Sequence, residues 1–181
     1  MNLRTLTLRL GNYGFFWICA IALTAFQSAL WLQLFGYTSS PYAWITVLAF
    51  WSIYRSAVEG LAMAYLLTLT VAPFTAMSLD LILFSHVFLF FCSYMLRQRI
   101  YWPGATYFML VCGFMAMLLP FAHLVGSWVL DDAESANFLF FEWIMRTLLT
   151  TLMGLPVYSL FVWLDRFTKK PLPQEARGDL L

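Results

Sequence analysis

The sequence predicts an all-α integral membrane protein with six transmembrane helices and both termini in the cytoplasm. Of its 181 residues, 62% are apolar and only 10% are charged, which is far less charge than a soluble domain of this length exposes. About 20 apolar residues cross a bilayer core of ~30 Å, and the chain contains several such runs. The net charge of +1 gives no reason to expect a nucleic-acid partner, so membrane lipid is the predicted environment.

Charged residues and helix breakers delimit six apolar segments. The first is 23 residues long, which favours an uncleaved span over a signal peptide. Pro41 and Pro103 stand where the second and fifth helices would begin, a position at which the missing proline N–H costs little. The segments are Tyr13–Phe35, Tyr42–Tyr54, Ala57–Ala72, Ala76–Leu96, Pro103–Val129 and Phe138–Leu164.

The second and third segments are short, so residues 42–72 could instead form one long tilted helix. Five spans would place Arg97 and Arg99 outside the cell, whereas six spans leave the outer loops 36–41, 73–75 and 130–137 without Lys or Arg. Basic residues are enriched in cytoplasmic loops, so six spans are favoured. The inner side then receives Arg4, Arg9, Arg55, Arg97, Arg99, Arg166, Lys169, Lys170 and Arg177, and the last outer loop carries Asp131, Asp132 and Glu134.

These spans divide the chain into a cytoplasmic N-terminus over residues 1–12, one transmembrane domain over 13–167 and a disordered cytoplasmic tail over 168–181. Pro120 and Pro156 each remove a hydrogen bond inside a span and are expected to kink the fifth and sixth helices.

Ionisable side chains are costly inside a span, so each needs a partner. Four of them, Asp80, His123, Glu142 and Arg146, are predicted to lie in the outer third of the bilayer, where they could meet. Glu142 and Arg146 are four residues apart, which suits an ion pair along one helix. The favoured interpretation is that Asp80 joins this pair and pins the fourth and sixth spans together. The alternative is an outward-facing pocket that binds a ligand or a partner's side chain.

Elsewhere the ionisable residues indicate structural roles. His86 is expected to be a neutral, hydrogen-bonded histidine, because no carboxylate lies three or four residues away. Arg55 and Glu59 pair opposite charges in the predicted inner turn. Cys19, Cys92 and Cys112 lie in apolar runs without metal-binding or redox spacing. Hydrolase, metalloprotease, lipid-head-group transferase and P-loop motifs are missing from the sequence, so no enzyme activity, catalytic residue, cofactor or metal is predicted.

Two motifs carry a resemblance to a known family. Ser40-Pro41-Tyr42-Ala43-Trp44 opens the second span, which runs into an inner turn, Arg55–Gly60, of the form Arg-Ser-x-Val-Glu-Gly. The last span ends in Gly154-Leu155-Pro156 followed by Leu164-Asp165-Arg166. Between Pro41 and Phe167 the chain resembles the family of the bacterial rod-shape-determining protein MreD, with which length, six spans and inner termini also agree.

The resemblance implies a non-enzymatic scaffold of the cell-elongation machinery in the bacterial inner membrane. It would bind MreC, a protein with one transmembrane helix, and be coupled to MreB filaments and to the peptidoglycan synthase pair RodA and PBP2. Small residues are expected to let partner helices approach closely: Ala25, Ala29, Gly60, Ala62, Ala64, Gly113 and Gly154. The alternative is the substrate-binding S-component of an energy-coupling-factor vitamin transporter, which has a similar length and topology and a related helical bundle.

Overall fold

The computed structural model describes residues 3–100, 102, 104–130 and 139–170, with side chains described from residue 11. These residues form helices and no strand. The helices are α1 (Leu3–Ala25), the π-helical turn η1 (Phe26–Leu30), α2 (Trp31–Phe35), α3 (Ala43–Tyr54), α4 (Ala57–Val71), the 3-10 turn η2 (Ala72–Phe74), α5 (Leu79–Arg99), α6 (Ala105–Leu130) and α7 (Phe140–Phe167). Because α1 already begins at Leu3, most of the expected N-terminal extension is helical.

Five helices in the described part of the chain are long and apolar enough to cross a membrane, which confirms an all-helical, multi-pass membrane character. They cover Gly11–Phe35, Ala57–Phe74, Leu79–Arg99, Ala105–Leu130 and Phe140–Phe167. The sixth apolar helix, α3, has 12 residues. At 1.5 Å per residue it is about 18 Å long, well short of a ~30 Å bilayer core.

The single long helix considered for residues 42–72 does not form. The chain is extended at Arg55 and Ser56, between the end of α3 and the start of α4. The Ser56 hydroxyl accepts a hydrogen bond from the backbone N–H of Glu59, which caps α4. The polar Arg-Ser pair therefore separates the two helices.

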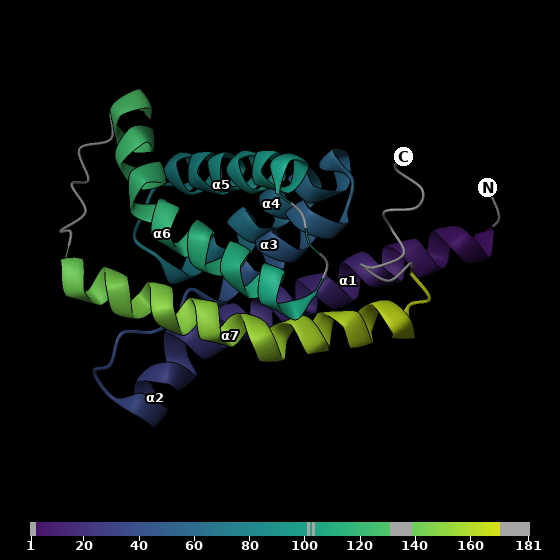
Figure 1. Cartoon of the computed structure of the whole chain (residues 1–181), viewed down its shortest axis with the longest axis horizontal. Helices are drawn as coiled ribbons and strands as arrows, with labels where there is room; N and C mark the ends of the chain where they lie inside the picture. The colour runs from purple at the N-terminus through teal and green to yellow at the C-terminus, as the bar shows by residue number, and fades with distance from the viewer. Residues whose placement is uncertain (1–2, 101, 103, 131–138, 171–181) are drawn as a thin grey trace.

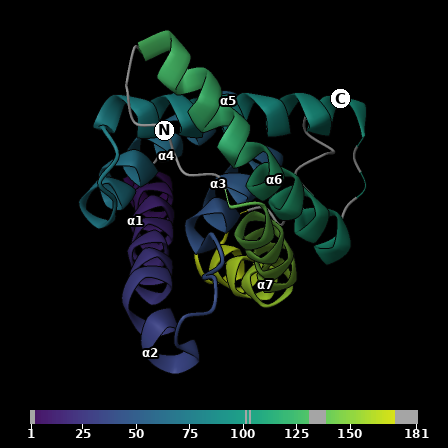
Figure 2. The same ribbon diagram turned by 90° about the vertical axis from the view of Figure 1, so that its left-hand side faces the viewer.

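The short helix α3 lies at the centre of the bundle. All of its residues are buried, and it contacts α1, α4, α5, α6 and α7 (Figures 1 and 2). Its sequence, AWITVLAFWSIY, is apolar on every side, as a helix enclosed by other helices requires. It therefore supplies much of the core that the longer helices surround.

Helices alternate in direction along the chain. Hydrogen bonds join Asn12 near the start of α1 to Asp165 near the end of α7, and Arg55 at the end of α3 to the same Asp165. The end of α5 lies there too, since Arg97 donates to the Arg55 carbonyl. The start of α1 and the end of α7 thus share one end of the bundle (Figure 1). We call it the basic end, because its described residues include Arg55, Arg97, Arg99, Arg166, Lys169 and Lys170.

Three glycines expected to receive partner helices are instead used inside the bundle. A Cβ atom on Gly60 of α4 would lie 2.2 Å from the Phe90 ring of α5, and one on Gly113 of α6 would lie 2.3 Å from the Thr151 hydroxyl of α7. A Cβ atom on Gly154 would come within 3.0 Å of the α6 backbone. Ala64 is buried as well. These positions let the protein's own helices approach closely.

Both predicted helix-interior prolines lie inside helices. Pro120 is in α6, whose axis changes direction along its length (Figure 1). Pro156 is in α7, which continues past it to Phe167 without a break. The proline in α6 is accompanied by the expected bend, and the last turns of α6 stand beside the start of α5 (Figures 1 and 2).

Candidate functional site

The four-residue polar cluster expected at the outer end reduces to one ion pair. Arg146 Nη2 lies 3.5 Å from Glu142 Oε2, and the guanidinium stands 5.5 Å from the centroid of the Tyr42 ring. Asp80 is exposed in the first turn of α5, and His123 is half-buried on α6. Because α3 and α6 lie between α5 and α7 (Figures 1 and 2), Asp80 does not reach the pair. The acidic loop residues Asp131, Asp132 and Glu134 lie outside the described residues.

His86 makes the hydrogen bond expected of it. Its Nδ1 lies 2.8 Å from the Thr68 hydroxyl, which itself donates to the Ala64 carbonyl of the same helix. Because the Thr68 hydroxyl proton points to the Ala64 carbonyl, the His86 Nδ1–H is the donor in the bond to the Thr68 oxygen. The imidazole also packs on the Trp44 ring at a centroid distance of 4.5 Å. His86 therefore ties α5 to α4 and α3.

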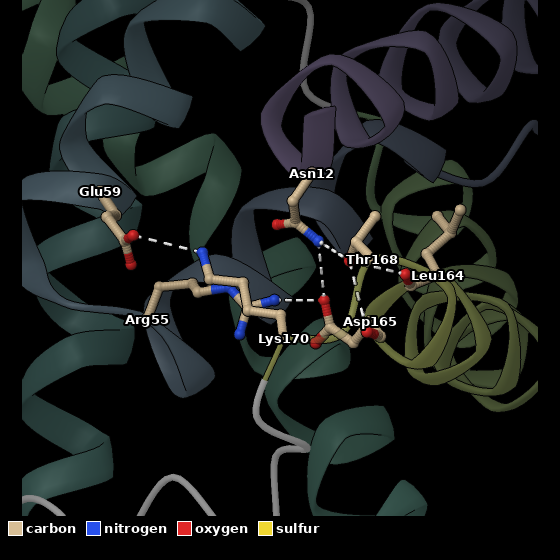
Figure 3. A network of polar contacts seen from close by, with 7 residues as sticks. All are labelled: Asn12, Arg55, Glu59, Leu164, Asp165, Thr168 and Lys170. Carbon is tan, nitrogen blue, oxygen red and sulfur yellow. Dashed lines mark hydrogen bonds and ion pairs between the residues drawn. The ribbon is translucent and has the colours of Figure 1, made fainter. Parts of the chain in front are cut away.

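The main assembly of polar side chains is at the basic end (Figure 3). It joins α1, α3, α4 and the end of α7. We call it the basic-end cluster, and its members are Asn12, Arg55, Glu59, Asp165, Thr168 and Lys170.

Arg55 and Asp165 form the centre of this cluster. Arg55 Nη2 donates to Asp165 Oδ1, and the two side chains are 3% and 0% exposed. The guanidinium lies over the rings of Phe16, Phe50 and Trp51, at 5.9, 5.5 and 5.6 Å from their centroids. Aromatic faces attract such a cation, so the rings stabilise charge that has left water.

Asn12 extends the network to α1. Its Nδ2 donates to Asp165 Oδ1 at 3.1 Å and to the Thr168 hydroxyl at 2.7 Å. The Thr168 hydroxyl in turn donates to the Leu164 carbonyl at 2.9 Å. One amide thereby fastens the first and last helices together.

Lys170 and Glu59 form the second ion pair, with Nζ 3.2 Å from Oε1. The ammonium also lies 5.3 Å from the ring centroids of Tyr13 and Trp51. Burial lowers the pKa of Lys170, and the neighbouring Arg55 charge lowers it further, while Glu59 opposes both. The cluster therefore encloses two cations that depend on their acids.

The first residues assigned to a disordered tail are packed against this cluster. Thr168 is buried, Lys169 takes a positive φ of 53°, and the Lys170 N–H donates to the Asp165 carbonyl at 3.0 Å. This left-handed residue ends α7 and turns Lys170 back toward Glu59. Residues 171–181 of the expected tail lie outside the described residues.

Arg97 supports the same end from α5. Its Nη1 donates to the Arg55 carbonyl at 2.9 Å and to the Ser52 carbonyl at 3.4 Å. These are among the last carbonyls of α3, which find no partner within their own helix. A cation at a helix C-terminus also complements the helix dipole.

Several polar atoms of the cluster are buried without a hydrogen-bond partner among the residues the structure describes: Asn12 Oδ1, Arg55 Nε and Asp165 Oδ2. No group of three potential metal ligands occurs in the described part of the chain. Removing one member of a buried ion pair typically costs ~3–5 kcal/mol, because the other charge stays buried alone. The arrangement can thus hold four helices in register at one membrane face.

Arg55 and Glu59 were singled out from the sequence as an inner turn, but their partners were not recognised. Arg55 and Glu59 do not form an ion pair with each other. Arg55 binds Asp165, and Glu59 binds Lys170. The available signal was that Arg55 and Asp165 both lie near the predicted inner membrane face, where an ionisable side chain needs a partner. Asn12 and Thr168 gave no such signal, since uncharged polar residues near a span end are common.

Comparison of the chain with known protein families, with curated proteins and with solved structures finds no match.

Proposed function

We propose that this protein is a non-enzymatic scaffold of the bacterial cell-elongation complex. It crosses the inner membrane six times with both termini in the cytoplasm. There it binds MreC and links MreB filaments to the peptidoglycan synthases RodA and PBP2.

The observation that carries the proposal is the meeting of the two segments on which the resemblance to the MreD family rests. Arg55 and Glu59 come from the Arg-Ser-x-Val-Glu-Gly turn, while Asp165 belongs to Leu-Asp-Arg and Lys170 follows it. The ion pairs Arg55–Asp165 and Lys170–Glu59 join these segments across more than a hundred residues. A shared structural role for both motifs explains why they would occur together in one family.

The distribution of charge supports the proposed orientation. Helix directions place the start of α1, the turn between α3 and α4, and the end of α7 at the basic end. Basic residues favour the cytoplasmic face, so this end is assigned to the cytoplasm.

The scaffold role is supported by what the helices expose. The ion pairs at the basic end point into the bundle, whereas large apolar side chains cover the outer faces of α1, α5, α6 and α7. Helix association in lipid depends on close packing and a few polar contacts. A partner that meets these faces inside the membrane would need no extramembrane domain on this chain.

The test combines depletion with co-purification. Depleting the protein from a rod-shaped cell is expected to round the cell, and affinity purification of tagged protein in mild detergent is expected to recover MreC. If depletion left cell shape intact and instead abolished uptake of a vitamin, the transporter S-component would replace the scaffold as the function.

A further inference from the structure

We propose that a groove along α5 binds the single transmembrane helix of a partner protein, and that this helix carries a lysine or arginine at its outer end. This inference rests on the proposed scaffold function and says where the scaffold's partner docks. The groove has a volume of about 700 Å³. Its lining consists of Asp80, Leu83, Phe84, Val87, Phe88, Phe91, Cys92, Met95 and Leu130.

The groove follows one face of one helix. All lining residues except Leu130 come from α5, and they repeat every three or four positions, which is the spacing of a single helix face. Phe84 and Phe88 stack along this face at a centroid distance of 6.2 Å, and Phe91 is half exposed. The floor is therefore a continuous apolar stripe.

The wall comes from α6 and depends on a glycine. A Cβ atom on Gly126 would lie 2.6 Å from Leu81 Cδ1 and 2.9 Å from Phe84 Cδ1. Any larger residue at position 126 would have to displace the Leu81 or Phe84 side chain, so glycine favours the close approach of the last turns of α6 to the start of α5, and Leu130 follows one turn later. The close contact places an apolar wall beside the stripe on α5.

Length favours a helix over a lipid chain as the occupant. Asp80 and Met95 are fifteen positions apart on α5, which is about 22 Å at 1.5 Å per residue. The hydrocarbon core is ~30 Å thick, so an acyl chain from one leaflet reaches only about 15 Å. A transmembrane helix fills the whole stripe, because it passes through both leaflets without interruption.

Charge determines which helix fits. Asp80 stands exposed at the outer end of the groove and makes no ion pair with any described residue. Two copies of this chain that met symmetrically through this face would bring Asp80 against Asp80 at the same depth. Like charges at the edge of the hydrocarbon repel, whereas a lysine or arginine on a different helix would neutralise the carboxylate.

The test uses site-specific photocrosslinking in living cells. The full-length protein carries Phe91→p-benzoylphenylalanine in the groove, with Leu152→p-benzoylphenylalanine on the exposed face of α7 as the matched control. Irradiation is expected to join position 91 to the transmembrane peptide of MreC and to leave position 152 without that adduct. Adducts at position 91 only with lipid, or with a second copy of this chain, would overturn the inference.

A pair of tryptophan variants tests the same docking site through the affinity for MreC. Val87→Trp fills the groove, and we expect it to reduce recovery of MreC about tenfold, equivalent to ~1.4 kcal/mol of binding free energy. Leu152→Trp should leave recovery unchanged. Equal recovery by both variants would contradict the groove as the docking site.

The two proposals fail in different ways. If wild-type protein recovers MreC but only the Leu152→p-benzoylphenylalanine variant crosslinks to it, the scaffold function is kept and the groove is excluded as the docking site. Wild-type protein that recovers no MreC loses the proposed function. In that case the groove is supported as a docking site only if the peptide crosslinked at position 91 is a transmembrane helix with a basic residue at its outer end. Any other result refutes the docking site.

Discussion

Arg55 and Asp165 show how a charged pair is kept inside a membrane protein. Each is almost fully enclosed, and each relies on the other, with three aromatic rings around the cation and Asn12 beside the anion. Pairing and cation–π contact together offset the loss of hydration. The pair is therefore expected to behave as one unit in mutagenesis.

We expect Asp165→Leu to lower the free energy of unfolding in detergent by ~3–5 kcal/mol, because the Arg55 charge is left buried without its acid. Arg55→Met should cost a similar amount. The double variant Arg55→Met, Asp165→Leu should be clearly more stable than either single variant, since it removes both charges. Thermal unfolding of the four proteins, followed by loss of soluble protein, checks this; additive losses would contradict the coupling.

The outer ion pair should matter less. Glu142 and Arg146 are 48% and 31% exposed and their closest charged atoms are 3.5 Å apart. Pairs of this kind contribute ~0–1 kcal/mol. Glu142→Gln is expected to shift the unfolding temperature much less than Asp165→Leu in the same detergent, and an equal shift would show that the outer pair carries comparable weight.

At the scale of whole helices, close approach is built into particular glycines. Gly60 faces the buried Phe90 ring, whereas Gly14 on α1 has open space where a Cβ atom would stand. The same substitution therefore has opposite expected effects at these two positions. The contrast separates helix packing from intrinsic helix propensity.

We expect Gly60→Ala to destabilise the protein by ~1–3 kcal/mol through overpacking against Phe90. Gly14→Ala should stabilise it by ~0.5–1 kcal/mol, because alanine is the better helix former and meets nothing. Adding Phe90→Leu to Gly60→Ala should recover part of the loss by making room. Unfolding midpoints in detergent measure all three, and a neutral Gly60→Ala would contradict the packing of α4 on α5.

Sequence predicts the apolar helices well, because their length and composition follow directly from the need to cross lipid. The position of α3 could not be predicted, since a helix that is apolar on every side fits both lipid and protein surroundings. The same ambiguity applies to Gly60, Gly113 and Gly154, which suit contacts within the chain as well as contacts with partners. Only the arrangement of helices distinguishes the two.

The candidate site was predictable in part for a related reason. The distribution of basic residues placed Arg55 and Lys170 on the same predicted side of the membrane. It did not indicate that Arg55 contacts Asp165, which is 110 positions away in the sequence. Their contact depends on which helices are neighbours, and depth in the membrane does not determine that. For Asp80 the sequence suggested a contact that is not made. Its predicted depth in the membrane matched that of Arg146, but α3 and α6 lie between α5, which carries Asp80, and α7, which carries Arg146.

At the scale of the whole molecule, α3 is the element on which the number of crossings depends. It spans only about 18 Å, at 1.5 Å for each of its 12 residues. The chain before it enters the bundle, since the Tyr42 N–H donates to the Thr150 hydroxyl and the Ala43 N–H to the Gln27 side chain. Thr150 is ten positions after the start of α7, about 15 Å along that helix. In the proposed six-span topology, the segment before α3 and α3 itself would share one crossing.

This geometry leads to a topological prediction. If α3 returns the chain to the cytoplasm, the connection after α5 is cytoplasmic and the connection after α6 is periplasmic. An impermeant maleimide should label Ala133→Cys in intact spheroplasts, whereas Gln98→Cys should react only after permeabilisation. The parent protein, with Cys19, Cys92 and Cys112, gives the background. With the N-terminus inside, five crossings would reverse this pattern, since the ends of α5 and α6 would exchange sides. Labelling of Gln98→Cys but not Ala133→Cys in intact spheroplasts would therefore refute the six-span arrangement.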